Sequence, residues 1–121
     1  MDRKAQRDAA YKLIFECLVT GNDRPYAFDE LAADYITRVF KGVLKHKDEL
    51  NVLIEKHAES SVQLFPADRA ALLLAVYEIL YEDEIPPAVS CNEAVELVKL
   101  YSTKKSPGYV NGILSGVMKN I

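Results

Sequence analysis

Apolar residues fill one stretch of the chain, residues 66–81, more completely than any other. From Ala70 to Tyr81, every residue except Glu78 is apolar or aromatic. A surface helix carries an apolar stripe, whereas a helix that is apolar on all sides must be enclosed by protein. The stretch is too short to span a bilayer, which needs about 20 apolar residues. It therefore predicts a buried central helix, and Pro66 and Asp68 suit its first turn.

The N-terminal half of the chain also follows the helical period of 3.6 residues. Residues 3–19 place their apolar side chains on one helical face, which predicts the first helix. A second apolar pattern runs from Phe28 to His57 and is interrupted by charged residues at 45–48. We expect the helix to break at this interruption, so the pattern predicts two helices there.

The C-terminal third contains two further helix starts. Ser90 opens a capping-box pattern with Glu93, and Ser106 precedes a proline in the same way. Gly112 and Gly116 lie one turn apart in the last predicted helix, where each glycine costs about 1 kcal/mol, so we expect a neighbour to approach both closely. Because no strand-like alternation occurs, the sequence predicts an all-α fold of six or seven helices.

Composition is typical of one globular domain over residues 1–121, since half of the residues are hydrophobic and the net charge is −3. The charge is uneven, because residues 1–12 and 97–121 are basic and the middle of the chain is acidic. Basic ends predict an anion-binding patch if the fold brings them together. The only cysteines, Cys17 and Cys91, form no CxxC pair, and the N-terminus lacks a secretory signal, so we expect a cytoplasmic protein with reduced thiols.

Motifs for catalysis or metal binding are absent from the sequence. The two histidines, His46 and His57, have no third ligand at a matching spacing, so we expect neither a metal nor a cofactor. Glu78 is the one carboxylate in the apolar stretch. It is either a catalytic acid with a shifted pKa or, as we expect, a hydrogen-bond partner of a neighbouring helix end.

The basic ends carry the candidate binding chemistry. Lys104 and Lys105 lie in a loop before the last predicted helix, and Tyr109 lies in its first turn. A helix N-terminus with lysines binds phosphate, and an exposed aromatic ring stacks on unpaired bases. Arg3 and Arg7 share one face of the first helix and would add phosphate contacts. This combination favours single-stranded RNA over duplex DNA.

Three blocks of this sequence, at residues 68–80, 85–97 and 105–114, resemble the NusB family of bacterial transcription antitermination factors. They correspond in order and spacing to the central helix, the next segment and the C-terminal motif of that family. The resemblance covers essentially the whole chain, although residues 21–63 match only by helical pattern.

The resemblance implies two three-helix bundles around the buried central helix. It also implies a non-enzymatic protein that binds boxA-type single-stranded RNA together with the ribosomal protein NusE. This heterodimer acts in the transcription elongation complex, promotes transcription of ribosomal RNA genes and involves no membrane.

By position, the resemblance implies two sets of site residues in this chain. The RNA contacts of the family correspond to Arg3, Lys4, Arg7, Lys105 and Tyr109. Positions near the junction of RNA and NusE correspond to Phe15 and Asp68. The chain departs from the family pattern where basic residues are common, at Ala5, Gln6, Leu73 and Gly108. These departures predict weaker RNA binding without the partner.

Three alternatives remain open at this point. The first is a helical protein–protein interaction module that has the NusB fold but does not bind RNA. The second is the RNA-binding domain of a ribosomal RNA cytosine methyltransferase, which we do not expect because the chain stops at Ile121. The third is a small helical enzyme that uses Glu78, which predicts an open pocket around that residue.

Overall fold

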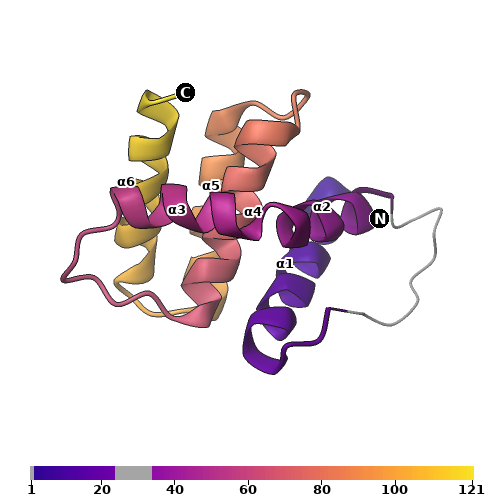
Figure 1. Cartoon of the computed structure of the whole chain (residues 1–121), viewed down its shortest axis with the longest axis horizontal. Coiled ribbons are helices and arrows are strands. Elements are labelled where there is room, and N and C mark those ends of the chain that lie inside the picture. The colour runs from indigo at the N-terminus through magenta and orange to yellow at the C-terminus, as the bar shows by residue number, and fades with distance from the viewer. Residues whose placement is uncertain (1, 24–33) are drawn as a thin grey trace.

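Six α-helices make up the computed structural model, which describes residues 2–23 and 34–121 (Figure 1). They are α1 (Arg3–Thr20), α2 (Asp34–Lys45), α3 (Lys47–His57), α4 (Pro66–Tyr81), α5 (Pro87–Tyr101) and α6 (Ser106–Lys119). No strand occurs in the described ranges, so the all-α prediction is confirmed. The start of the second apolar pattern, at Phe28, lies outside the described residues. None of the helices described is long and apolar enough to cross a membrane.

Helix α4 is the centre of the fold, as its apolar sequence predicts. All residues from Ala70 to Glu78 are buried. Helices α1 and α2 pack on each other and on α4, and helices α5 and α6 also pack on each other and on α4. Two groups of three helices therefore share the central helix, and α3 packs on α4 and α6. Helix α3 lies across the molecule from the end of α2 to α6 (Figure 1).

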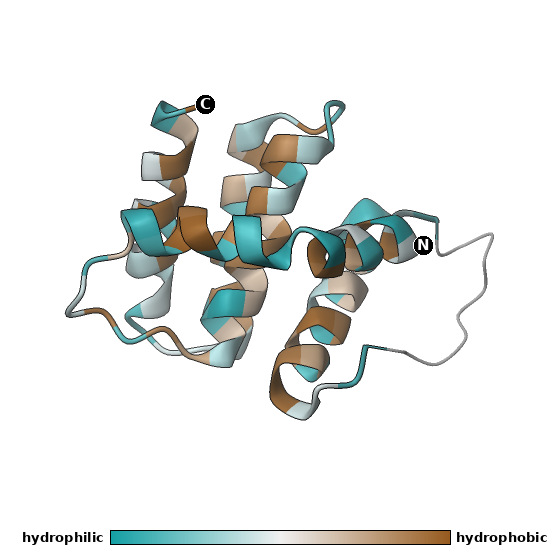
Figure 2. Ribbon diagram, in the orientation of Figure 1, coloured by the Kyte–Doolittle hydropathy of each residue, from teal (hydrophilic) through white to brown (hydrophobic). Residues whose placement is uncertain are grey.

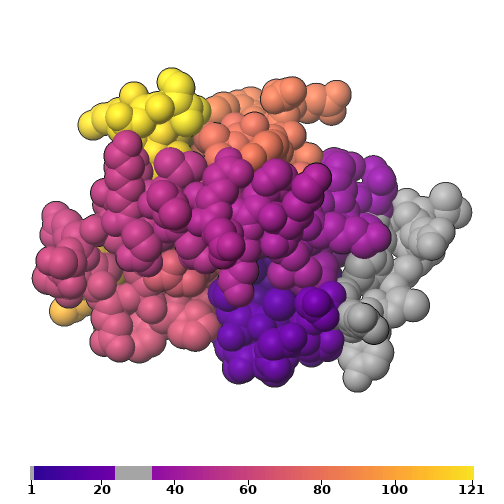
Figure 3. Space-filling view, in the orientation of Figure 1, coloured from indigo at the N-terminus to yellow at the C-terminus, as the bar shows by residue number. Residues whose placement is uncertain are grey.

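The outer helices divide their surface between core and solvent. The ribbons of α1 and α3 carry alternating hydrophobic and hydrophilic bands, as amphipathic helices do (Figure 2). In α2, the buried side chains are Tyr35, Ile36, Val39, Phe40 and Val43, which repeat at helical spacing. Together α2 and α3 cover one face of the molecule, next to α1 (Figure 3).

Two helix boundaries show which local sequence signals determine where a helix begins or ends. Helix α2 ends at Lys45 and α3 begins at Lys47, so the predicted break at the charged interruption is confirmed. Helix α5 begins at Pro87 rather than at the capping box of Ser90, so that prediction is wrong. Ser90 lies one turn inside the helix and is 1% exposed. A proline at the first helical position opens the helix here, because its missing N–H would be unpaired there in any case.

Glycines in α6 have different environments. A Cβ on Gly116 would lie 2.6 Å from Nδ1 of His57, so α3 and α6 approach closely at this residue, as predicted. A Cβ on Gly112 would meet no atom within 4 Å, so the same prediction is wrong for Gly112. A second close approach was not predicted: Gly42 of α2 packs directly against the ring of Tyr77.

Candidate nucleic-acid interface

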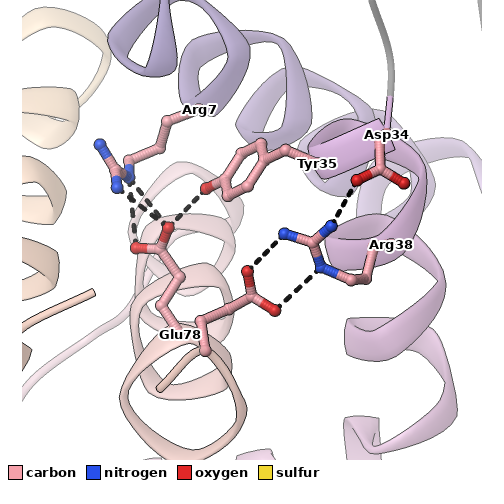
Figure 4. A network of polar contacts seen from close by, with 6 residues as sticks. Arg7, Asp34, Tyr35, Arg38 and Glu78 are labelled. Atoms are coloured by element: carbon pink, nitrogen blue, oxygen red, sulfur yellow. Dashed lines mark hydrogen bonds and ion pairs between the residues drawn. The ribbon is translucent and has the colours of Figure 1, made fainter. Parts of the chain in front are cut away.

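A buried ion pair joins α1 to α4 (Figure 4). Nε of Arg7 donates to both carboxylate oxygens of Glu78 at 3.2 and 3.1 Å, and Nη2 lies 3.1 Å from Oε2. The hydroxyl of Tyr35, from α2, donates to the same carboxylate at 2.5 Å. Arg7 is 4% exposed and Glu78 is fully buried. The carboxylate therefore fixes the positions of three helices relative to one another.

Protonation states in this network follow from its surroundings. Burial, followed by the charge and the hydrogen bond of Glu78, raises the pKa of Tyr35. Burial lowers the pKa of Arg7, but the hydrogen bond and charge of Glu78 outweigh it, so the pKa of Arg7 lies above its ordinary value. Tyr35 thus remains a hydrogen-bond donor and Arg7 remains charged. Glu78 is fully buried, and its hydrogen-bond partners are the side chains of Arg7 and Tyr35 rather than the helix end that the sequence predicted.

Arg7 cannot act as the predicted direct RNA contact in this structure, because its guanidinium is buried against Glu78. The first turn of α1 instead exposes Arg3 and Lys4. The guanidinium of Arg3 lies over the ring of Tyr35, 4.1 Å from its centroid. Nζ of Lys4 lies 3.7 Å from a carboxylate oxygen of Glu93, and the lysine side chain is 72% exposed. Both charges remain available to a phosphate.

A second ion-paired group lies next to this network at the surface (Figure 4). Arg38 of α2 donates from Nη1 to Asp34 at 2.8 Å, and from Nε and Nη2 to Glu82 at 3.0 and 2.7 Å. Glu82 follows the last residue of α4, so Arg38 ties α2 to the C-terminal end of the central helix. The hydrogen bond with Glu82 raises the pKa of Arg38.

Asp68 also has a different position from the one predicted. It is fully buried, which contradicts a direct contact with a partner in this structure. Its Oδ1 accepts a hydrogen bond of 2.6 Å from the hydroxyl of Ser102, and its Oδ2 accepts one of 3.0 Å from the amide of Phe65. Asp68 therefore ties the start of α4 to the loop between α5 and α6.

That loop carries the predicted C-terminal site residues. Lys104 and Lys105 are exposed, and Tyr109 in the first turns of α6 is half-buried. The hydroxyl of Ser106 accepts from the amide of Thr103 at 3.2 Å, which closes the loop onto the helix. The lysines thus extend from a loop with a defined backbone, rather than from a free chain end.

Aromatic side chains surround the start of α4 on its α1 side. The hydroxyl of Tyr11 donates to the carbonyl of Ala67 at 3.0 Å, and its ring stacks on Tyr101 at 5.5 Å between centroids. Burial, followed by the charge of Asp68, raises the pKa of Tyr11 to about 12. Tyr101 is 43% exposed, and Phe15, one turn beyond Tyr11, is 38% exposed. Unpaired bases could stack on these rings.

The fold therefore brings together some of the predicted residues and separates others. Lys105 and Tyr109 line one pocket together with Phe65, beside the start of α4. Phe15 lies one turn beyond Tyr11, whose hydroxyl donates to Ala67 in the first turn of α4. Arg3 and Lys4 lie at the other end of α1, about 18 Å from Phe15 at a rise of 1.5 Å per residue. Sequence reasoning missed Phe65 and Tyr101, which are exposed at the same end of the molecule. Phe65 precedes the first residue of α4 and Tyr101 is the last residue of α5, and at helix ends the apolar period does not show which side chains are exposed.

Residues 4–119 match the model of the NusB family. The chain belongs to the NusB family. It is 36% identical to the transcription antitermination protein NusB of Bacillus pumilus over 128 residues, covering 100% of this chain and 98% of the relative. The corresponding protein of Bacillus subtilis is 34% identical, with the same coverage.

Solved structures agree with this membership in the NusB family. NusB of T. maritima superimposes with a TM-score of 0.88 and is 30% identical, covering 98% of this chain and 92% of that chain. A crystal structure of the antitermination factors NusB and NusE in complex with dsRNA contains a similar chain. That chain gives a TM-score of 0.83 and is 27% identical, with 98% and 97% of the two chains covered.

Proposed function

We propose that this NusB-family protein is a transcription antitermination factor that binds boxA-type single-stranded RNA together with NusE. In this role it joins the transcription elongation complex in the cytoplasm and promotes transcription of ribosomal RNA genes. Residues 1–121 act as a single RNA-binding domain, by binding and without catalysis. The observation that carries the proposal is the group of exposed aromatic and lysine side chains around the start of α4.

The chemistry of this surface suits an unpaired strand. Phe15, Tyr101 and Tyr109 offer aromatic rings, and Lys105 offers a charge in the pocket that Tyr109 also lines. Base stacking on aromatic rings is tolerant of sequence and requires bases that are not already paired. Lysines neutralise phosphates and make the affinity dependent on salt. Arg3 and Lys4, at the far end of α1, would contact a more distant part of the same strand.

The protein partner is supported by charge and by exposed apolar surface. The middle of the chain is acidic, and a basic ribosomal protein would complement it. Phe15, which by family resemblance corresponds to a position near the junction of RNA and partner, is 38% exposed. Arg7 and Asp68 have positioning roles in this proposal, since both are buried and hydrogen-bonded within the fold.

The test is a titration of labelled boxA-type single-stranded RNA with this protein, alone and with NusE, at two salt concentrations. A duplex of the same sequence is the control. We expect weak binding alone, tighter binding with NusE, loss of affinity at higher salt and a preference for the single strand. A complex with NusE that binds neither RNA would refute the proposal and support the interaction-module alternative.

A further inference from the structure

An open pocket of about 430 Å³ lies between the segment that precedes α4 and the loop that precedes α6. It is lined by Ser61, Gln63, Phe65, Thr103, Lys104, Lys105 and Tyr109. Neither the sequence patterns nor the family resemblance pointed to the first three of these residues. The pocket therefore combines the predicted C-terminal site with a segment that had no assigned role.

Two aromatic rings line this pocket from opposite segments of the chain. Phe65 is 43% exposed, although a phenylalanine at the start of a helix could have packed inward. Tyr109 lines the pocket from α6, and it also lines a second pocket of about 230 Å³ on the α3 side. The larger pocket thus offers aromatic carbon on two sides.

Asp68 holds both sides of the pocket in place. One carboxylate oxygen accepts from the amide of Phe65, and the other accepts from Ser102, which begins the lysine-bearing loop. Because Asp68 is fully buried, these two hydrogen bonds are shielded from water. The pocket is therefore preformed, which lowers the entropic cost of binding a ligand there.

Polar groups at the pocket define the chemistry of its ligand. Lys104 and Lys105 are exposed at its rim, and no carboxylate is among its lining residues. By contrast, the lining of the pocket between α1 and α5 includes three carboxylates, Asp8, Glu93 and Glu96, together with Lys4 and Arg7. The amide of Gln63 can both donate to and accept from the edge of a base. Flat aromatic walls, a donor–acceptor amide and cations at the rim fit a nucleotide.

We propose that Phe65 and Tyr109 form a subsite for one unpaired nucleobase of the bound RNA. Lys104 and Lys105 hold the phosphates that flank this base, and Gln63 contacts its edge and selects among bases. The subsite rests on the proposed function, since it describes where the same RNA strand is held. It adds Phe65 and Gln63 to the residues that determine affinity and specificity.

The experiment uses the full chain with NusE and boxA-type RNA that carries 2-aminopurine at one position at a time. Stacking of this base on an aromatic ring quenches its fluorescence. We expect Phe65→Ala to relieve quenching at one position and to weaken binding about 5- to 150-fold, the range for one stacked base. Gln63→Ala should reduce discrimination among bases at that same position.

Two controls separate the subsite from general effects. Phe65→Ala keeps the backbone amide that Asp68 binds, so its helicity and melting should match those of the unmodified protein. Tyr81→Ala removes a similarly exposed ring, 39% exposed, at the opposite end of α4 and should leave quenching and RNA affinity unchanged.

Each outcome of this experiment supports or refutes the proposed base subsite. Wild-type affinity and quenching in a folded Phe65→Ala variant would overturn the subsite and leave the proposed function standing. If the unmodified protein with NusE does not bind the RNA at all, both the subsite and the proposed function fail. Relief of quenching at every position would also refute a subsite for a single base.

Discussion

Replacement of Arg7 by Met tests the buried network most directly. The Arg7 side chain is 5% exposed and that of Glu78 is 0% exposed, so water cannot solvate the carboxylate that the variant leaves unpaired. Removing one partner of a buried pair costs roughly 3–5 kcal/mol. The free energy of unfolding of a domain is about 5–15 kcal/mol, so the variant would lose roughly a fifth or more of its stability.

Thermal and urea denaturation would measure this loss. We expect Arg7→Met to lower the melting temperature on the order of 10–25 °C for a domain of this size. The triple variant Arg7→Met, Tyr35→Phe, Glu78→Met should recover most of the stability, because it removes every polar member of the network together. The matched control is Arg38→Met, whose side chain is 42% exposed and whose loss should cost about 1 kcal/mol or less. A loss below about 1 kcal/mol in Arg7→Met would refute the reasoning.

Three further predictions concern packing, RNA affinity and pH. Gly116→Ala should destabilise the fold by about 1–3 kcal/mol through overpacking against His57, whereas Gly112→Ala should be neutral or stabilising by up to about 1 kcal/mol in urea denaturation. If Gly116→Ala and Gly112→Ala changed the stability equally, the proposed difference in packing around the two glycines would be refuted. Arg3→Glu should lower both the RNA affinity and its salt dependence with unchanged helicity, and unchanged binding would exclude this end of α1 from the interface. The pKa of Tyr11 is raised to about 12, so its contribution to stability is complete below about pH 10 and is lost as the pH rises through 12. Tyr11→Phe should therefore show a shallower loss of stability over this range than the unmodified protein, and an identical slope would contradict the assignment.

The sequence predicted those parts of the fold that depend on local pattern. The burial of residues 70–78 and the break between α2 and α3 follow from apolar periodicity, which reports which face of a helix is covered. The candidate site was predicted less well, because its geometry depends on hydrogen bonds between residues that are far apart in the sequence. Arg7 meets Glu78 across 71 positions of sequence, and Asp68 meets Ser102 across 34. Arg7 was predicted as an RNA contact and Asp68, from the family resemblance, as a partner contact, because a helix pattern does not show which distant side chain a charged residue meets.

The antiparallel packing of α1 on α4 has a consequence for the length of RNA that this protein can hold. Arg7 contacts the C-terminal half of α4, whereas Tyr11, one turn further along α1, contacts the first turn of α4. Arg3 therefore lies toward the C-terminal end of α4, away from the lysine loop, which Asp68 ties to the start of α4. A strand that contacts both Arg3 and the lysine loop is a bivalent ligand, whose second contact benefits from the effective concentration that the first one creates. Oligonucleotides too short to reach from Arg3 to the lysine loop would engage one of the two sites only, so affinity would rise in a step with length rather than in proportion to it.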